Sequence, residues 1–395
     1  MPENSHDSTP ETCLAWLRLS QLRGVGPVLV RRVVEALGSP QAVLTASSAR
    51  LADVPDIGPV RAKAFASAMS LDDAQRELAL AHDSGVHILC PDDPRWPKPL
   101  KFIHDPPLIL YVRGELIEQD AVALGIVGSR ECTMYGRQQA ERFGALLASA
   151  GFTVVSGGAR GIDTAAHHGA LRAKGRTIIV QGCGLNHTYP AENAELYDRV
   201  AREGSGAVIS ELPMNAPPHK DNFPPRNRII AALSLGVLVV EAHQRSGSLI
   251  TARLAADDYG REVFALPGRV DSLASRGTHH LIKNMTAHLV EDIDDILNAL
   301  GDVGEAIKKT QQAKAEESKA AALFDQKRDP TPAIVFTGPQ QKILAALGDD
   351  DVDIDSLVEH TGLGVGVLMA ELTALQIRGV VAKLGGNRFE KKKRG

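Results

Sequence analysis

Short turns rich in glycine, serine and arginine follow apolar runs at several places in this chain. Their candidate binding residues are Gly128, Ser129 and Arg130; Ser156, Gly157, Gly158, Arg160 and Gly161; and Ser246, Gly247 and Ser248. Exposed backbone amides in such turns, and the helix N-termini that follow them, bind anions such as phosphate. A fourth turn of this kind is expected at 267–269, with a further helix opening at 275–278. Several adjacent anion sites suit a polymer of phosphates better than a single nucleotide.

The longest loop, residues 211–228, contains two proline pairs and a cluster of cations around one aromatic residue. Its candidate binding residues are Lys220, Phe223, Arg226, Asn227 and Arg228. A ring beside cations is typical of sites for single-stranded nucleic acid, in which bases stack on the ring and phosphates contact the cations. The alternative is that Phe223 fills a small core while the arginines pair with acidic neighbours. The flanking prolines and polar residues favour stacking.

An enzymatic function is the rival class. The candidate groups are Ser156, Asp163, His167, His168, Glu211 and Glu241. However, the chain lacks the Gly-x-Ser-x-Gly nucleophile turn, the Walker Gly-x-x-x-x-Gly-Lys loop and a Gly-x-Gly-x-x-Gly turn after its first apolar run. A helix beginning after Gly161 accounts for Asp163, whose carboxylate favours the helix dipole. Carboxylates at strand ends can also orient arginines. We therefore assign no catalytic residue and no metal ligand.

The elements that must position these turns follow a regular alternation. Apolar runs lie at 123–127, 152–155, 177–180, 207–209, 236–240 and 263–266, separated by segments of helical character. Runs that are apolar throughout predict strands covered on both faces. The pattern therefore predicts an α/β fold with a doubly wound, mainly parallel sheet. The turns after parallel strands meet at the carboxyl edge of the sheet, so the predicted turns should lie near one another.

Residues 1–88 predict a helical domain with an internal repeat. The Gly-Pro turn at 22–27 recurs at 54–59, and each is followed by a helix that carries basic residues. The repeat resembles the helix-hairpin-helix pair of DNA-associated proteins, whose turn amides can face a phosphate. The alternative is that these turns only link packed helices.

The C-terminal part of the chain changes character twice. Residues 301–332 are rich in Lys, Glu, Gln and Ala and predict a linker. Residues 333–395 regain helical periodicity and end in two short apolar runs around 385–387, which predicts a winged helix. Its third helix, at 364–377, carries few groups suited to reading base edges. Protein contact or weak DNA contact is therefore favoured over sequence-specific binding.

Composition limits the class of protein. The chain has 395 residues, a hydrophobic fraction of 44% and a formal net charge of −4, which suits two or three globular domains but excludes coating of nucleic acid by bulk positive charge. Four scattered cysteines indicate neither a disulfide framework nor a zinc site. The polar N-terminus and the lack of a long apolar run predict a cytoplasmic protein that does not span the membrane.

Together these motifs resemble the bacterial DNA-processing family called DprA or Smf. The resemblance is carried by Trp96-Pro97 to Tyr111, GIVGSR, VVSGGARGIDTAAH, the segment 184–193, FPPRNR and RSGSLITA. It implies a Rossmann-like domain over 89–300 that binds single-stranded DNA, flanked by a SAM-like helix-hairpin-helix domain and the winged helix. It further implies a homodimer, without catalysis or cofactor, that protects incoming DNA and loads the RecA recombinase during natural transformation (competence).

The resemblance also implies roles for individual residues. Arg130 is similar to the family's phosphate-binding arginine, and Lys220 and Phe223 to its cation and base-contacting ring. The chain departs from the family at His279, where asparagine is common, and at 284–285, which reduces the expected contribution of the fourth turn. The expected partners are single-stranded DNA, RecA, a second copy of the chain and single-stranded DNA-binding protein. The alternative is a nucleotide-binding enzyme similar to nucleoside-monophosphate hydrolases.

Overall fold

The computed structural model describes residues 10–22, 24–202, 204–312, 336–348, 351–384 and 387–392. The chain divides into two compact units, Met1–Lys314 and Ala315–Gly395. In the predicted linker, residues 302–312 are helical. Its remainder, 313–332, lies outside the described residues, as do 1–9, 333–335 and the basic end of the tail, 393–395. None of the described helices is long and apolar enough to cross a membrane.

Six helices make up the N-terminal part of the first unit. They are α1 (Pro10–Ser20), α2 (Pro27–Leu37), α3 (Pro40–Thr45), α4 (Ser48–Ala52), α5 (Gly58–Phe65) and α6 (Leu71–Asp83). Serine side chains cap α3, α4 and α6 by accepting from an amide of the first turn. The two predicted Gly-Pro turns lead directly into α2 and α5, because proline fits the first turn of a helix. The predicted helical domain is therefore confirmed.

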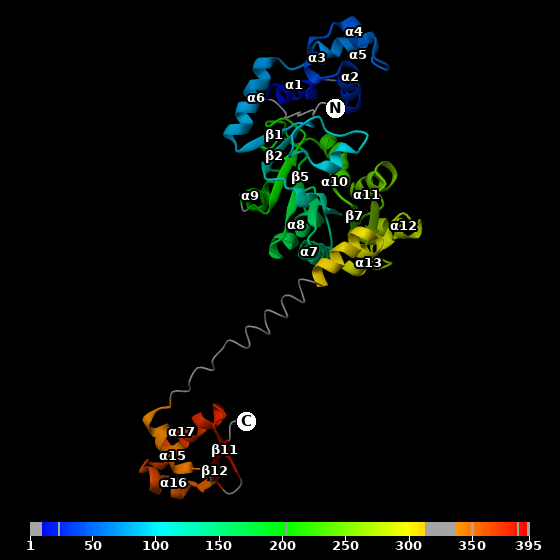
Figure 1. Cartoon of the computed structure of the whole chain (residues 1–395). Helices are drawn as coiled ribbons and strands as arrows, with labels where there is room; N and C mark the ends of the chain where they lie inside the picture. Colours follow the sequence, from blue (N-terminus) through cyan, green and yellow to red (C-terminus); the bar gives the residue numbers. More distant parts are fainter. Residues whose placement is uncertain are drawn as a thin grey trace. The chain divides into compact units, whose positions relative to one another are not determined.

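These helices pack against one end of a nine-stranded sheet (Figure 1). The carboxylate of Glu77 in α6 accepts hydrogen bonds from the hydroxyl of Tyr111, at 3.0 Å, and from the amide of Met214, at 2.7 Å. The indole of Trp16 in α1 donates to Asp92 at 2.9 Å. A shared apolar core joins the helices to the sheet. The helical domain is thus held rigidly by buried polar contacts as well as apolar packing.

The sheet has a parallel centre and an antiparallel edge. Its strands are β1 (Val86–Leu89), β2 (Leu110–Gly114), β3 (Ala123–Val127), β4 (Thr153–Ser156), β5 (Thr177–Val180), β6 (Gly206–Ser210), β7 (Gly236–Val239), β8 (Glu262–Ala265) and β9 (His288–Leu289). They lie in the order β1-β2-β6-β5-β4-β3-β7-β8-β9. In this order, each pair of neighbours from β6 to β9 is parallel, whereas the pairs β1–β2 and β2–β6 are antiparallel. The predicted mainly parallel sheet is confirmed.

Helices cover both faces of this sheet, as the continuous apolar strands predict. One face packs against α7 (Met134–Ala150), α8 (Ile162–Arg172), α9 (Ala194–Arg202) and α13 (Ile293–Ala299). The other face packs against α10 (Phe223–Leu233), α11 (Ser248–Arg253) and α12 (Arg276–Lys283). A one-turn π-helix, Leu254–Asp258, continues α11. Five 3-10 turns complete the unit: η1 (Lys98–Lys101), η2 (Glu118–Ala121), η3 (Ala191–Asn193), η4 (Lys220–Asn222) and η6 (Leu273–Ser275).

The structure differs from the sequence prediction at the edges of the sheet. The predicted boundary at residue 88 falls within β1, which pairs with β2 and so belongs to the sheet. The two-residue strand β9 was not expected, because two residues carry no readable periodicity. All four cysteines are free, and Cys90 and Cys183 are buried. A two-residue edge strand depends on its partner more than on its own composition, which explains why β9 was not expected.

The second unit is a winged helix, as predicted. It consists of α15 (Gly338–Leu347), β10 (Val352–Asp353), α16 (Ile354–Thr361), α17 (Val365–Ile377), β11 (Val381–Lys383) and β12 (Arg388–Lys391). Its strands lie in the order β10-β12-β11 around a core that includes Leu368 and Phe389. The exposed side of α17 carries Val365, Val367 and Ile377. The glycines 385–386 of the predicted turn lie outside the described residues.

Candidate nucleic-acid interface

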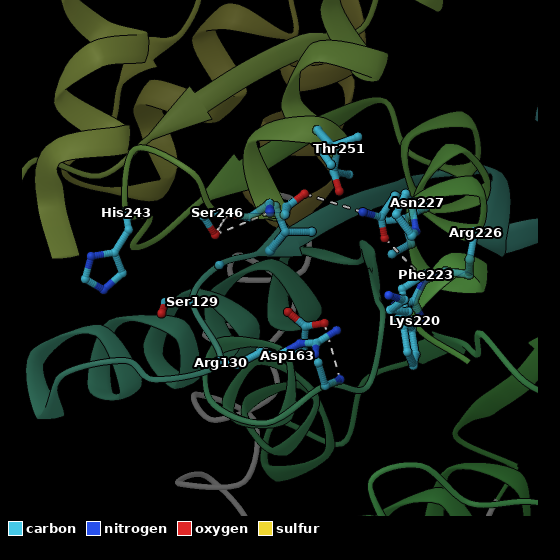
Figure 2. A pocket seen from close by; sticks show the side chains of 18 of the residues that line it. Ser129, Arg130, Asp163, Lys220, Phe223, Arg226, Asn227, His243, Ser246 and Thr251 are labelled. Carbon is cyan, nitrogen blue, oxygen red and sulfur yellow. Dashed lines mark hydrogen bonds between the residues drawn. The ribbon is translucent and has the colours of Figure 1, made fainter. Parts of the chain in front are cut away.

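The largest concentration of predicted binding residues lies where the strand order reverses. The chain runs outward from β3 through β4, β5 and β6, then returns to place β7 on the other side of β3. At such a switch point the loops after the two central strands diverge and leave a crevice at the carboxyl edge. A cavity of about 640 Å³ occupies this place. We call it the switch-point cavity, and Figure 2 shows side chains that line it.

Ten of the sequence-predicted residues line this cavity. They are Gly128, Ser129, Arg130, Lys220, Phe223, Arg226, Asn227, Ser246, Gly247 and Ser248. They come from the loops after β3 and β7 and from the start of α10, which are far apart in sequence. This placement agrees with the prediction that the turns lie near one another at the sheet edge. Their contact with a ligand stays a prediction.

The loop after β3 is held rigidly by its neighbours. The amide of Ser129 donates to the carbonyl of Glu241 at 2.8 Å, and the carbonyl of Ser129 accepts from Ile162. The Glu241 carboxylate, which is 3% exposed, accepts from the amide and the hydroxyl of Thr133 at 2.8 and 2.6 Å. Gly161 has a φ of 77°, and a side chain there would lie 2.4 Å from the carbonyl oxygen of Ser129. Glycine thus allows the two turns to approach each other closely.

Phe223, the first residue of α10, is a half-buried ring surrounded by cations. The guanidinium carbons of Arg130 and Arg226 lie 5.1 and 5.8 Å from its centroid, and the ring of Tyr189 lies 5.4 Å away. Both guanidinium distances are in the range of cation–π attraction. The ring packs over Gly182, where a side chain would approach it to 2.7 Å. Its position is therefore fixed before any ligand binds.

The cations of the cavity differ sharply in exposure. Arg130, Lys220 and Arg245 are exposed, and among the described residues Lys220 and Arg245 form no ion pair. Arg226 is only 5% exposed, and its guanidinium donates to the carbonyls of Gly157, at 2.8 Å, and Val180. Three exposed cations and the buried Arg226 line the cavity together with two acidic side chains, Glu131 and Asp163. The lining therefore has excess positive charge, which favours an anionic ligand.

The turn after β7 adds small polar groups to the opposite wall. The hydroxyls of Ser246 and Ser248 lie 2.8 Å apart, and the amide of Ser248 points to the Ser246 hydroxyl at 3.4 Å. Asn227 in α10 donates its amide to the carbonyl of Gly247 at 3.4 Å, which ties this turn to the Phe223 wall. Figure 2 shows Ser246 and Thr251 on the side facing Arg130 and Asp163. The cavity thus offers hydroxyls opposite its cations.

The turn after β4 makes internal hydrogen bonds that its composition does not show. Its amides at Gly157 and Ala159 donate to the carboxylate of Asp163, at 3.2 and 3.3 Å. The hydroxyl of Ser156 is buried and donates to the carbonyl of Ile126 at 2.6 Å. The amides expected to bind phosphate are therefore already occupied by a carboxylate of the same chain. The sequence showed Asp163 but not that it folds back over the turn.

Six predicted residues lie outside the cavity lining. They are Ser156, Gly157, Gly158, Arg160, Gly161 and Arg228. Arg228 is 8% exposed and pairs with Glu211 and Asp105, which is the alternative considered for the arginines of this loop. Arg160 is exposed but forms a two-point ion pair with Glu192.

Several lining residues were not singled out from the sequence. Tyr189, His243, Arg245 and Thr251 all face the cavity. Arg245 directly precedes the predicted Ser246 turn, so a cation at this turn could have been predicted from the sequence. Tyr189 comes from the loop after β5 and carries no local signal. Only the parallel arrangement of β4, β5 and β6 brings that loop to the same edge.

The groups considered for catalysis do not converge. The Nδ1 atom of His167 contacts the hydroxyl of Thr177 at 2.6 Å, and this imidazole is fully buried. Ser156 is bonded to the backbone, as described above, and Glu241 holds Thr133. Among the described residues no three His, Cys, Asp or Glu side chains form a potential metal site. The carboxylates at the strand ends position loops and arginines instead.

Asp163 should make stability depend on pH. Burial raises its pKa to about 6, although the Arg226 charge and the amides of Ala159 and Gly157 oppose this shift. The folded state then holds a proton that the unfolded chain releases, so stability falls as pH rises from about 4 to about 6. Two pKa units correspond to about 3 kcal/mol. We expect Asp163→Asn to remove this loss of stability. The free energy of unfolding in urea, measured at several pH values across that range, tests this.

The wild-type protein is the control at each pH, because another buried group titrates nearby. Burial lowers the pKa of His167 to about 3. That group makes stability rise over the same range, since the unfolded imidazole takes up a proton that the folded one does not. The difference between variant and wild type cancels this effect. An equal pH slope in both proteins would contradict the role given to Asp163.

Comparison with known proteins places this geometry in a family. Residues 87–301 match the model for DNA recombination-mediator protein A, 17–68 match a SAM-like helix-hairpin-helix tandem, and 314–387 match the DprA winged helix domain. Protein Smf of Synechocystis is 34% identical over 95% of this chain and 98% of its own length. The chain belongs to the DprA family. Its switch-point cavity lies within the part of the chain that matches the recombination-mediator model.

Other members agree with this assignment. Protein Smf of Escherichia coli is 38% identical over 76% of each chain. The crystal structure of DNA processing protein A from Streptococcus pneumoniae has a TM-score of 0.61 and 33% identity, and the match covers 72% of this chain and 95% of that one. The DprA family thus accounts for the sheet and for both flanking domains.

Proposed function

We propose that this protein binds single-stranded DNA in the switch-point cavity. The observation that carries the proposal is the fixed, half-buried Phe223 ring with the exposed cations Arg130, Lys220 and Arg245 around the same cavity. A base can stack on the ring while phosphates contact the cations, which is how proteins bind single strands without reading sequence. A duplex keeps its bases stacked inside and cannot offer one to the ring. The cavity therefore favours single strands.

Membership of the DprA family supports a wider role as a recombination mediator. We propose that the protein acts in the cytoplasm as a homodimer, protects incoming single strands during natural transformation and delivers them to the RecA recombinase. Single-stranded DNA-binding protein would be a further partner. The uncharged exposed side of α17 supports a contact of the winged helix with protein rather than with base edges. No cofactor is required for these steps.

The basic test is a binding titration with labelled single-stranded and duplex oligonucleotides of one sequence. It is carried out at about 50 and 200 mM salt, because phosphate contacts release counterions and make affinity fall with salt. We expect tighter binding to the single strand and a clear salt dependence. Equal affinity for both forms, or no effect of salt, would overturn the proposal. RecA filament formation on coated single strands, with and without the protein, then tests the mediator role.

Arg130→Ala tests the phosphate contact directly. The residue is exposed and touches Phe223 through its guanidinium, so its removal should leave the fold unchanged. We expect affinity for single strands to fall roughly tenfold, because a charged hydrogen bond contributes about 1.5 kcal/mol. The slope of log affinity against log salt should decrease by about 0.7. Arg172→Ala, which removes an exposed arginine of α8 outside the cavity, is the matched control and should bind as the wild type does.

A further inference from the structure

A second cavity lies beside the switch-point cavity at the same edge of the sheet. Its volume is about 650 Å³. Its lining residues are Thr133, Met134, Tyr135, Glu241, Pro267, Gly268, Arg269, Ser272 and Ser275. We call it the Tyr135 cavity. It contains the fourth turn that the sequence predicted, together with the first turn of α7.

Two segments of the chain contribute neighbouring residues to both cavities. In the loop after β3, residues 127–131 line the switch-point cavity and residues 133–135 line the Tyr135 cavity. After β7, His243 lines the first cavity and Glu241 the second. The Glu241 contacts to Ser129 and Thr133 hold the shared wall in place. A polymer leaving the first cavity over this wall would therefore enter the second.

The Tyr135 cavity has a fixed aromatic surface. Tyr135 is 45% exposed, and its hydroxyl donates to the carbonyl of Pro267 at 3.2 Å. The residue lies in the first turn of a 17-residue helix whose N-cap, Thr133, is held by Glu241. The ring is thus anchored at both ends while much of its surface faces solvent. A ring held in this way can stack a base with little loss of side-chain entropy.

Polar groups for the sugar-phosphate chain lie on the opposite wall. Arg269 has a side chain that is 82% exposed and pairs with Asp271, which is 66% exposed. An ion pair in such contact with water contributes about 0–1 kcal/mol, so a phosphate can replace its carboxylate. The hydroxyls of Ser272 and Ser275 line the same cavity. The Glu241 carboxylate is engaged by Thr133 and therefore presents little free charge to a ligand.

We propose that the Tyr135 cavity is a second nucleotide subsite, which takes a base from the strand held in the switch-point cavity. This inference rests on the proposed function, because it requires a single strand in the first cavity. The occupant is a further nucleotide of the same strand, because residues close to one another in the chain line the two cavities and because a ring with a nearby cation suits a base with its phosphate. Tyr135 stacks the base, and Arg269 contacts the phosphate.

Binding of oligothymidylates of about 4 to 16 nucleotides tests this subsite, because single-strand sites of one domain span this range. Phe223→Ala should weaken binding at every length. Tyr135→Ala should leave the shortest oligonucleotides unaffected and weaken the longer ones about tenfold. Tyr135→Phe keeps the ring and should bind as the wild type does. Leu273→Ala removes an exposed apolar side chain outside the lining and is the matched control.

Photo-crosslinking of the wild-type protein to 5-bromouracil oligonucleotides gives a readout that needs no variant. We expect a crosslinked peptide that contains Tyr135. If Tyr135→Ala binds every length as the wild type does and no such crosslink forms, while Phe223→Ala is weakened, the subsite is disproved and the proposed function stands. If neither variant changes binding, the proposed function itself fails.

Discussion

Arg226→Ala should lower the free energy of unfolding by about 3–5 kcal/mol, the usual result of removing one partner from a buried ionic network. The side chain is 5% exposed and donates to the carbonyls of Gly157 and Val180, which join the turns after β4 and β5. Its charge also opposes the rise in the pKa of Asp163. Removing it leaves two buried carbonyls without a donor and a carboxylate without its nearest cation.

Urea unfolding of wild type, Arg226→Ala and Lys220→Ala measures this effect. Lys220 belongs to the same cavity but is exposed, so its removal should change stability by less than about 0.5 kcal/mol. The two variants separate a cation that builds the cavity from one that is free to bind ligand. If Arg226→Ala were as stable as the wild type, Arg226 would have to be regarded as a ligand-binding group only.

Phe223→Ala should cause the largest loss of DNA binding, about 1–3 kcal/mol, because base stacking on an aromatic ring contributes that much. The ring lies between Arg130 and Arg226 and against Tyr189. Removing it deletes the stacking surface and also releases the Arg130 guanidinium from its position. Fluorescence anisotropy with a labelled single strand measures the change.

Two further substitutions distinguish stacking from packing at this position. Phe223→Leu keeps an apolar side chain over Gly182 but has no π face, so it should bind nearly as weakly as Phe223→Ala. Phe223→Trp offers a larger ring and should keep most of the affinity. Wild-type affinity in Phe223→Leu would show that the ring only fills the core beneath the loop, which is the alternative considered from the sequence.

The phosphate-binding turns illustrate how far composition can be read. Glycine and serine after a buried strand predict exposed amides. Residues 246–248 line the cavity, but the amide of Ser246 donates to the carbonyl of His243 at 3.0 Å and the amide of Ser248 to the hydroxyl of Ser246 at 3.4 Å. At 156–161 the carboxylate of Asp163 accepts from the amides of Gly157 and Ala159. A carboxylate six residues away satisfies those donors at lower cost than a ligand would. Local sequence does not show whether a ligand or another group of the same chain accepts hydrogen bonds from these amides.

The arginines of the 211–228 loop illustrate the same limit for charge. Lys220, Arg226 and Arg228 are similar in sequence but differ in the structure, since Lys220 is exposed and the two arginines are 5% and 8% exposed. Glu211 and Asp105 neutralise Arg228, and backbone carbonyls bind Arg226. Exposure depends on where α10 begins and on which strand ends lie beneath it, and both are set by distant segments.

The sequence by itself determined the architecture of this DprA-family protein. Strands that are apolar throughout must be covered on both faces, Gly-Pro pairs mark the starts of helices, and amphipathic helices bury one face. It also predicted two parts of the candidate site from local chemistry, the Arg130 turn and Phe223, and both line the switch-point cavity. Only the tertiary structure decided which cations remain free, which amides are already bound, and that the Tyr135 cavity adjoins the first. Those outcomes depend on the strand order, which places loops distant in sequence at one edge of the sheet.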